Sequence, residues 1–435
     1  MIIPIIQRTL KVLFNMAEKK GLLILLFPIL LAACTGKSGN SSTEQASGAR
    51  DIVGDYMLEP VSGKTAFDYF RDEGILVGWN LGNTLDSYSN GIGSETTWGN
   101  PPINQEIMNG VKAAGFDLIR IPITWMGHIG SAPDHTIAPQ RLKRVAEAVE
   151  MAHNAGLKVI INLHHDGSTS SLDQEEGWLS IGKSYKSEDE YNRITRQFTR
   201  VWEQIAAYFQ NYGDWLIFEP MNEIHDGGWC WSSDFRSNPA PQLAIINKWN
   251  QIFTDVVRRA GGNNAQRYLV IPAYCTNPQQ TLSPAFLLPN DSTPNKQIVS
   301  FHYYDPWEFG INSSRSNWGT AADKQKTDDD FAPFKTRFID NKIPVIIGEC
   351  GAVLQLFPDD PAREAQARQS RFEYLPHVFS MARKYNLVPI YWDNGGIRGN
   401  GEKFGLLDRR TGMANSVDSA ELLRLMISSV KQEVN

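Results

Sequence analysis

Eight runs of apolar residues, each about the length of a β-strand, constrain most strongly how this 435-residue chain can fold. Most of them are apolar almost without interruption, which is typical of parallel strands covered on both faces. The runs lie at residues 75–81, 116–121, 157–163, 215–221, 268–271, 298–303, 345–348 and 387–392. Because eight strands alternating with helices favour a closed barrel, we predict an α/β fold of the (β/α)8 TIM barrel type.

The segments between these runs have helical periodicity or composition, for example 139–155, 188–210, 243–260, 331–341 and 362–385. Gly156 and Gly213 each follow such a segment and indicate the end of a helix before a new strand. A doubly wound open sheet is the alternative fold, but no G-x-G-x-x-G turn follows the first run. With neither an internal repeat nor a second linker, the sequence predicts a single domain over residues 54–435.

The N-terminal segment has the pattern of an export signal. Lys19 and Lys20 precede an apolar run at 21–33, which is too short to span a bilayer comfortably. The run ends in Leu31-Ala32-Ala33-Cys34, which resembles a bacterial lipobox. We therefore expect a signal peptide over 1–34, lipidation of Cys34 and a flexible, Ser- and Gly-rich tether over 35–53. This predicts an exported lipoprotein anchored to a membrane, at the cell surface or in the periplasm; a short helix with a chance cysteine is the alternative.

Charge and cysteine content narrow the choice of partners and cofactors. The net charge is −6 and no Lys/Arg-rich block occurs, so we expect no nucleic-acid partner, and a neutral substrate suits the chain.

Besides Cys34, Cys230, Cys275 and Cys350 remain, and this odd number cannot form a complete disulfide framework. Cys230 and Cys275 either pair or are buried free thiols. No C-x-x-C zinc motif is found, and we expect a monomer with no metal and no cofactor.

Two glutamates lie where apolar runs end. Glu223 closes the run at 215–223 and Glu349 closes the run at 343–349. Carboxylates at the carboxyl ends of different strands can converge if the strands belong to one barrel, whose chemistry lies at that face. A pair of carboxylates held apart by a rigid scaffold is what cleavage of a glycosidic bond requires. The pair therefore predicts a glycosidase.

Tryptophan is abundant near the same face. Nine of the twelve tryptophans lie in the first or last run or in a loop that follows a run: Trp79, Trp98, Trp125, Trp178, Trp229, Trp231, Trp307, Trp318 and Trp392. The apolar faces of sugar rings stack on indole rings, so a polysaccharide cleft is one explanation and packing of the loops is the other. We expect two or three of Trp178, Trp229, Trp231, Trp307 and Trp318 to contact sugar.

Six short motifs, each at a predicted strand end, resemble those of glycoside hydrolase family 5, particularly its endoglucanase-type subfamily 4. Singly each motif is weak evidence, but here they follow the order of the family over nearly the whole mature chain. They are Gly78-Trp79-Asn80-Leu81-Gly82-Asn83-Thr84-Leu85-Asp86, Ile119-Arg120-Ile121-Pro122, Asn162-Leu163-His164-His165-Asp166, Asn222-Glu223, His302-Tyr303-Tyr304 and Gly348-Glu349.

The resemblance implies a retaining enzyme on a (β/α)8 barrel that cleaves β-linked polysaccharide. Glu223 would be the general acid/base and Glu349 the nucleophile, with carboxyl groups ~5–5.5 Å apart. Seven further residues would orient these carboxylates or bind sugar: Arg120, His164, His165, Asn222, His302, Tyr304 and Trp392. His165 and Asp166 would each line a more distant subsite or only cap the loop.

Two departures from the family pattern leave the catalytic groups intact. Ile224 stands where many members have proline, and Cys350 where an aromatic residue is common. The expected activity is an endo-β-1,4-glucanase, with xyloglucan, mixed-linkage glucan or β-mannan as alternative substrates. The rival hypotheses are a metal-dependent barrel hydrolase that uses His164, His165, Asp166, His302 and Glu223, and a surface lipoprotein that binds glycan without cleaving it.

Overall fold

The computed structural model describes residues 56–432 except 168, 172–173, 176 and 400. The expected signal peptide, lipidated Cys34 and tether lie outside the described residues, so those three expectations stay predictions. Within the described part, no helix combines the length and the apolar character needed to cross a membrane.

The eight expected runs form eight parallel strands that close into a barrel, as predicted. Neighbouring strands follow the order β1-β12-β11-β10-β9-β8-β5-β4, and β4 pairs with β1 to complete the ring. The strands are β1 (Gly78–Leu81), β4 (Leu118–Ile121), β5 (Lys158–Ile161), β8 (Leu216–Phe218), β9 (Leu269–Pro272), β10 (Gln297–Tyr303), β11 (Val345–Cys350) and β12 (Leu387–Asp393). Two short antiparallel pairs lie outside the barrel: β2 (Tyr88–Ser89) with β3 (Ile92–Gly93), and β6 (Thr169–Ser171) with β7 (Gln174–Glu175).

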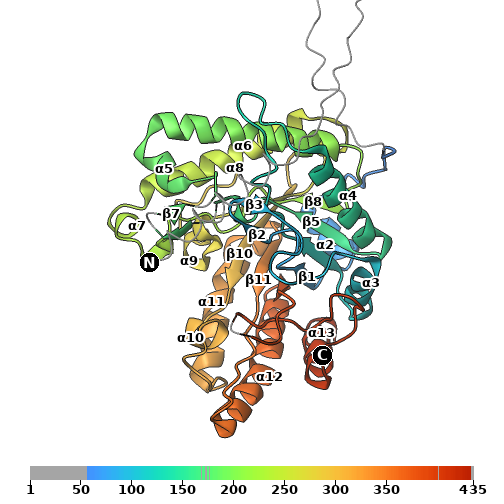
Figure 1. Ribbon diagram of the computed structural model, residues 1–435, viewed down its shortest axis with the longest axis vertical. Coiled ribbons are helices and arrows are strands. Elements are labelled where there is room, and N and C mark those ends of the chain that lie inside the picture. The colour runs from blue at the N-terminus through green and yellow to red at the C-terminus, as the bar shows by residue number, and fades with distance from the viewer. Residues whose placement is uncertain (1–55, 168, 172–173, 176, 400, 433–435) are drawn as a thin grey trace, which may run out of the picture. The chain divides into compact units, whose positions relative to one another are not determined.

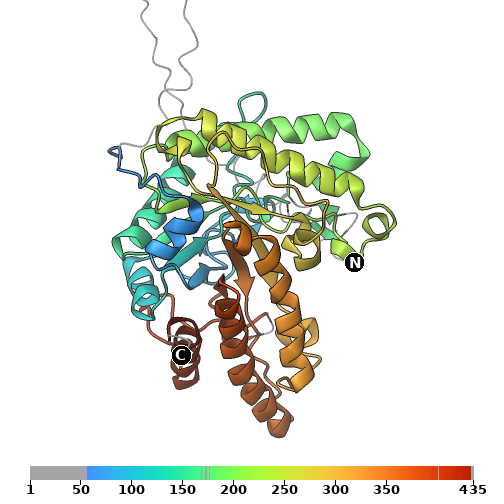
Figure 2. The same ribbon diagram turned by 180° about the vertical axis from the view of Figure 1, so that it is seen from behind.

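Helices cover the outside of the barrel, with α6 and α8 side by side in one part and α11 and α12 in another (Figures 1 and 2). The longer ones are α3 (Gln105–Ala113), α4 (Pro139–Asn154), α6 (Glu188–Tyr208), α8 (Ala240–Arg259), α11 (Ala321–Arg337), α12 (Pro361–Lys384) and α13 (Val417–Lys431). The shorter ones are α2 (Ala66–Asp72), α5 (Ile181–Lys186), α7 (Ser233–Ser237), α9 (Pro278–Thr281) and α10 (Trp307–Gly310).

The expected helix at 331–341 was wrong at both ends. α11 begins ten residues earlier, at Ala321, where Thr320 and Asp323 form a capping box, and it ends at Arg337. Its first half is largely charged and lacks an apolar stripe, so periodicity could not reveal it. The capping pair at its start was the available signal. By contrast, α4 ends as expected, because Gly156 takes a left-handed φ of 83° directly after it.

Alternation along the strands separates an inner layer from an outer one. Leu118 and Ile217 belong to a buried apolar cluster that also includes residues of β5, β9, β10, β11, β12 and α2. Their neighbours Ile119 and Phe218 pack with the surrounding helices instead. Because side chains two positions apart share a face, Arg120 and Glu219 point inward above the apolar layer. The barrel therefore carries a polar layer at its carboxyl-terminal end.

Candidate active site

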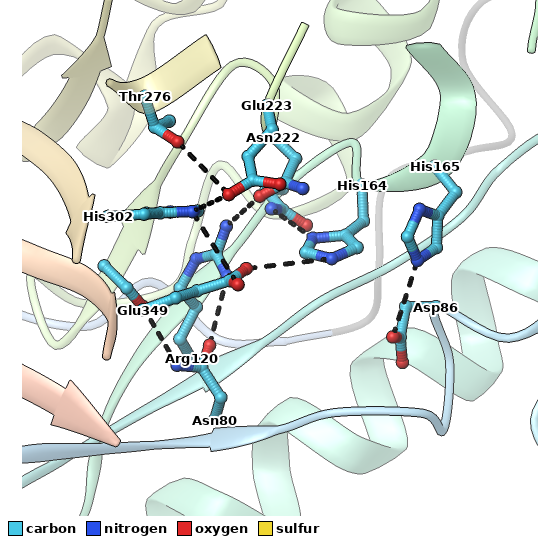
Figure 3. Close-up of polar contacts among 12 residues, drawn as sticks. Asn80, Asp86, Arg120, His164, His165, Asn222, Glu223, Thr276, His302 and Glu349 are labelled. Carbon is cyan, nitrogen blue, oxygen red and sulfur yellow. Dashed lines mark hydrogen bonds and ion pairs between the residues drawn. The ribbon is translucent and has the colours of Figure 1, made fainter. Parts of the chain in front are cut away.

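Arg120 is the centre of the polar layer (Figure 3). Its side chain is fully buried, and Nε donates to Oε2 of Glu219 at 2.7 Å. Nη1 donates to Oδ1 of Asn80 at 3.0 Å and to Oε1 of Glu349 at 2.9 Å, and Nη2 donates to Oδ1 of Asn222 at 2.8 Å. A buried guanidinium is stable only when its charge and donors are matched, and here two carboxylates and two amides do so. Arg120 thereby fixes four residues from three strands or strand ends.

Glu349 and Glu223 face each other at this end of the barrel (Figure 3). One carboxylate oxygen of each lies within 4.8 Å of the other. So close an approach of the oxygens agrees with the ~5–5.5 Å between the carboxyl groups of retaining glycosidases and lies well below the separation in inverting ones. The ladder between β10 and β11 shifts register at Phe301/His302, an irregularity of the kind that re-aims side chains next to active sites.

The two carboxylates have different surroundings. Glu349 accepts hydrogen bonds from Arg120 and, at 2.9 Å, from the Tyr304 hydroxyl. Glu223 has no cation in direct contact among the described residues; His302 Nδ1 lies 2.5 Å from its Oε1, and the Thr276 hydroxyl donates to the same oxygen at 3.5 Å. Glu223 is also the more exposed, with 21% of its side chain accessible against 7% for Glu349. Glu349 is therefore ion-paired, whereas the neighbouring Glu223 is not.

These surroundings separate the protonation states. Burial raises the pKa of Glu223 to about 7, and Arg120 opposes this rise. Burial also raises the pKa of Glu349, whereas Arg120 and the Tyr304 hydroxyl favour its charged form. Burial lowers the pKa of His302 to about 4, so its imidazole is neutral near neutral pH. Nδ1 of a neutral imidazole donates to the Glu223 carboxylate in one tautomer and accepts from the protonated carboxyl group in the other, so contact in both states requires the ring proton to change nitrogen.

His164 and Trp392 line the other side of Glu349. His164 Nε2 lies 3.8 Å from Glu349 Oε1, and its Nδ1 lies 3.2 Å from Nδ2 of Asn162. The rings of His164 and Trp392 are parallel with centroids 5.8 Å apart. Burial lowers the pKa of His164 well below its ordinary value, so it is a neutral hydrogen-bonding group. The two rings thus stack on each other beside Glu349.

His165 lies farther out. Its Nε2 is 3.9 Å from Oδ2 of Asp86, and its ring packs against Trp98 with centroids 5.3 Å apart and against Tyr88 at 5.4 Å. His165 thus belongs to an aromatic cluster next to the catalytic pair rather than to the pair itself. Trp98 in this cluster is 40% exposed.

Two groups of described residues bring potential metal ligands within 4.8 Å: Glu223, His302 and Glu349 in one, and Asp86, His164 and His165 in the other. In the first group, Glu349 is already ion-paired with Arg120, whose positive charge would repel a metal ion. In the second, the Asp86 carboxylate accepts from the backbone amides of Asn83 and Thr84. The donor sets favour ion pairing and proton transfer over metal coordination.

The sequence matches the family model described as cellulase (glycosyl hydrolase family 5) over residues 83–397, more than half of the chain. The chain belongs to glycosyl hydrolase family 5. It is 37% identical to Endoglucanase A of Paenibacillus barcinonensis, with 73% of this chain and 80% of that protein covered. It is 33% identical to the xyloglucan-specific endo-beta-1,4-glucanase BoGH5A of Bacteroides ovatus, with 79% and 66% covered.

A solved structure agrees with this family assignment. The GH5-4 broad specificity endoglucanase from Bacteroides salanitronis superimposes with a TM-score of 0.78 at 38% identity, with 87% of this chain and 98% of that chain covered. The resemblance to subfamily 4 expected from the motifs is thus confirmed, and so are the glycoside hydrolase class and the barrel.

A cleft of about 950 Å³ in this family 5 enzyme opens on the side of Glu223 and His302. Loops after β8, β9 and β10 form it, and Trp229, Trp231 and Trp307 line it with 41%, 81% and 53% of their surfaces exposed. Of the other two expected sugar contacts, Trp318 lines the cleft but is buried, with 5% exposed. Trp178 instead donates its indole N–H to Asp166 at 2.7 Å.

Asp166 is a loop cap rather than a subsite residue. Its carboxylate accepts from the Trp125 backbone amide at 2.9 Å as well as from Trp178, and it is fully buried. Burial raises its pKa to about 6. Of the two roles considered for Asp166, the structure supports capping.

Sequence reasoning missed four residues of the enzyme's polar layer: Asn80, Asn162, Glu219 and Thr276. Glu219 is the most important, because it is fully buried and shares Arg120 with Glu349. A charged residue in an otherwise apolar strand end, four positions before Glu223, was the available signal. Thr276 lies in a turn outside any motif, so its position depends on the fold alone.

Proposed function

We propose that the enzyme is a retaining endo-β-1,4-glucanase in which Glu349 is the nucleophile and Glu223 the general acid/base. The observation that carries this proposal is the carboxylate pair, with oxygens within 4.8 Å of each other and with one member ion-paired to Arg120 and the other not. A nucleophile must be ionised and an acid must be protonated at the same pH. The contacts of Glu349 and the raised pKa of Glu223 provide both conditions.

In the first step Glu349 attacks the anomeric carbon of the sugar that lies over Trp392. The glycosidic C–O bond breaks as a covalent glycosyl-enzyme forms, and Glu223 transfers its proton to the departing oxygen. Asn222, held by Arg120, is placed to hydrogen-bond the 2-hydroxyl of that sugar, a contact that strengthens in the transition state. The leaving chain lies on the Glu223 side, along the tryptophan-lined cleft.

In the second step Glu223, now a carboxylate, takes a proton from water. The water oxygen attacks the anomeric carbon, the bond to Glu349 breaks and the β configuration is restored. His302 contacts Glu223 in both of its protonation states, because a neutral imidazole can act as donor in one tautomer and acceptor in the other. The Thr276 hydroxyl contacts the same oxygen of Glu223 and helps to keep it in position.

The shape of the site supports internal cleavage of a polymer. Aromatic surface extends beyond the catalytic pair on both sides, to Trp98 in one direction and to Trp229, Trp231 and Trp307 in the other. The curated relatives described above are named endoglucanases. Xyloglucan is the second candidate substrate, because one relative is named for it and the cleft, at about 950 Å³, has room for branched chains.

We further propose that the enzyme acts outside the cytoplasm as a monomer on a lipid anchor at Cys34. The lipobox-like Leu31-Ala32-Ala33-Cys34 and the apolar run before it support this. Metabolic labelling with a radioactive fatty acid in a bacterial host should label the wild-type chain and not the Cys34→Ala variant. Equal labelling of both would contradict the anchor.

Reducing-sugar release, with EDTA present, from carboxymethylcellulose, barley β-glucan, xyloglucan, β-mannan and xylan tests the proposed activity. We expect release from the first two, and from xyloglucan if branches are tolerated. The Glu349→Gln variant, which should fold and bind glycan but release nothing, is the control for contaminating activity. No release from any of the five by folded protein would contradict the proposal.

A further inference from the structure

Two cysteines meet between loops of the substrate cleft. Cys230 lies in the 3-10 turn Trp229–Trp231 after β8, and Cys275 lies in the turn Tyr274–Thr276 after β9. Besides burial, the neighbouring Cys230 thiol raises the pKa of Cys275, and both residues line the cleft. Cys230 is half-buried, Cys275 is 5% exposed, and both are free thiols in this structure.

Hydrogen bonds that involve neither thiol hold the two loops together. The Cys275 backbone amide donates to the Ile224 carbonyl at 3.1 Å. The Asp226 amide donates to the Tyr274 hydroxyl at 3.3 Å, and the Asp226 carboxylate accepts from the Ser232 hydroxyl at 2.8 Å. These hydrogen bonds hold the backbone of both loops in place around the two thiols.

We propose that Cys230 and Cys275 form a disulfide that fixes the Trp229–Trp231 turn beside the acid/base. The bond would link residues 275 − 230 = 45 positions apart, a long loop whose closure restricts the unfolded chain substantially. Cys350 is not a competing partner, because it is fully buried and its thiol donates to the Ile390 carbonyl at 3.6 Å.

Oxidation proceeds by exchange with a low-molecular-weight disulfide such as oxidised glutathione. The Cys230 thiolate attacks one sulfur of glutathione disulfide, and one glutathione thiolate leaves. The Cys275 thiolate then attacks the Cys230 sulfur and displaces the second glutathione. Two cysteine protons end on two glutathione thiols, so glutathione disulfide is reduced by the two electrons that the cysteines lose. Burial raises the pKa of Cys275, which favours the more accessible Cys230 as the first nucleophile.

The disulfide would restrain Trp229 and Trp231, which lie on the side of the cleft where the leaving group is expected to bind. Trp229 stacks on His225 with centroids 4.1 Å apart, and Trp231 has 81% of its surface exposed and no aromatic partner recorded among the described residues. Pre-ordering a turn removes the entropy that substrate binding would otherwise have to supply. This consequence rests on the proposed function, whereas the bond itself does not.

Intact mass and peptide mapping after treatment with oxidised glutathione test the bond without any activity measurement. We expect the enzyme to lose two hydrogen atoms in mass, to yield a Cys230–Cys275 linked peptide, and to gain about 3–6 °C in melting temperature. The Cys230→Ser variant should show none of these changes, and Cys350→Ala should show all three. Alkylation of both Cys230 and Cys275 in the oxidised, denatured wild type would overturn the proposal.

Kinetics on two substrates test the restraint of the turn. Oxidation should lower KM for a long cello-oligosaccharide by about 2–5-fold and leave an aryl β-cellobioside, whose leaving group is short, unchanged. Cys230→Ser should not respond to oxidation with either substrate. A linked peptide with an unchanged KM for the long substrate would overturn the restraint while leaving the bond intact, and inactivity on both substrates would count against the proposed function instead.

Discussion

The chemistry of this enzyme depends on how one buried arginine is shared. Arg120 contacts both Glu219 and Glu349, whereas Glu223 is held by a neutral histidine. The negative charge of Glu349 is therefore balanced by the Arg120 cation, whereas Glu223 has no cation in contact among the described residues. This asymmetry explains how two glutamates a few ångströms apart can have opposite roles at one pH.

The alkaline limb of the pH profile should belong to Glu223. With its pKa raised to about 7, kcat/KM should fall above that pH as the acid loses its proton, and fall on the acid side as Glu349 becomes protonated. For a cellobioside with a dinitrophenyl leaving group, which needs no acid, the Glu223→Gln variant should lose the alkaline limb while retaining most of its kcat/KM. Persistence of that limb in the variant would assign it to another group.

The same residue should make stability depend on pH. The folded pKa of Glu223 is about 7, above its ordinary value of 4.5, so its contribution to stability is complete below about pH 4.5 and is lost as pH rises through 7. The loss is about 3 kcal/mol. Glu223→Gln stays neutral at every pH and should therefore melt a few degrees above wild type at pH 8 and at the same temperature near pH 4.5.

Calorimetry at both pH values checks this stability prediction. Glu95→Gln is the matched control: although burial opposes it, Arg144 lowers the pKa of Glu95, so this variant should melt below wild type at pH 8. Equal melting temperatures of Glu223→Gln and wild type at pH 8 would show that the Glu223 carboxylate ionises in the fold without cost.

At the scale of the elements, α10 (Trp307–Gly310) brings Trp307 to the cleft wall with 53% of its surface exposed. Trp307→Ala should raise KM for a long β-glucan by about 3–10-fold through lost stacking, with kcat changed less than about twofold. Met413→Ala, which removes an exposed apolar side chain that does not line this cleft, is the control and should leave KM unchanged. A kcat loss in Trp307→Ala would place this indole nearer to the reacting bond than we propose.

The elements also show what the sequence could and could not predict. Each expected strand is present in the structure. An unbroken apolar run of this length can be buried in few ways other than as a parallel strand covered on both faces. The start of α11 was missed because its first half is solvated and periodicity reports only burial. Glu219 was missed because its partner Arg120 is distant in sequence, and only the closure of the barrel brings the two together.

At the scale of the whole molecule, the barrel explains why the expected site residues lie close together. Six of the residues expected to act together do lie around the catalytic pair: Arg120, His164, Asn222, His302, Tyr304 and Trp392. His165 joins the neighbouring cluster with Trp98. Strand order alone determines this convergence, whereas the loops that select a substrate vary independently of it.

Covalent trapping tests the central claim most directly. A dinitrophenyl 2-deoxy-2-fluoro-β-cellobioside should inactivate the enzyme by forming a stable glycosyl-enzyme. The fluorine slows both formation and hydrolysis of the intermediate, and the good leaving group speeds formation alone, so the intermediate accumulates. Mass spectrometry of a peptic digest should then find the sugar on the peptide that contains Glu349. An adduct on another carboxylate, or turnover with inversion of the anomeric configuration and no adduct, would contradict the account.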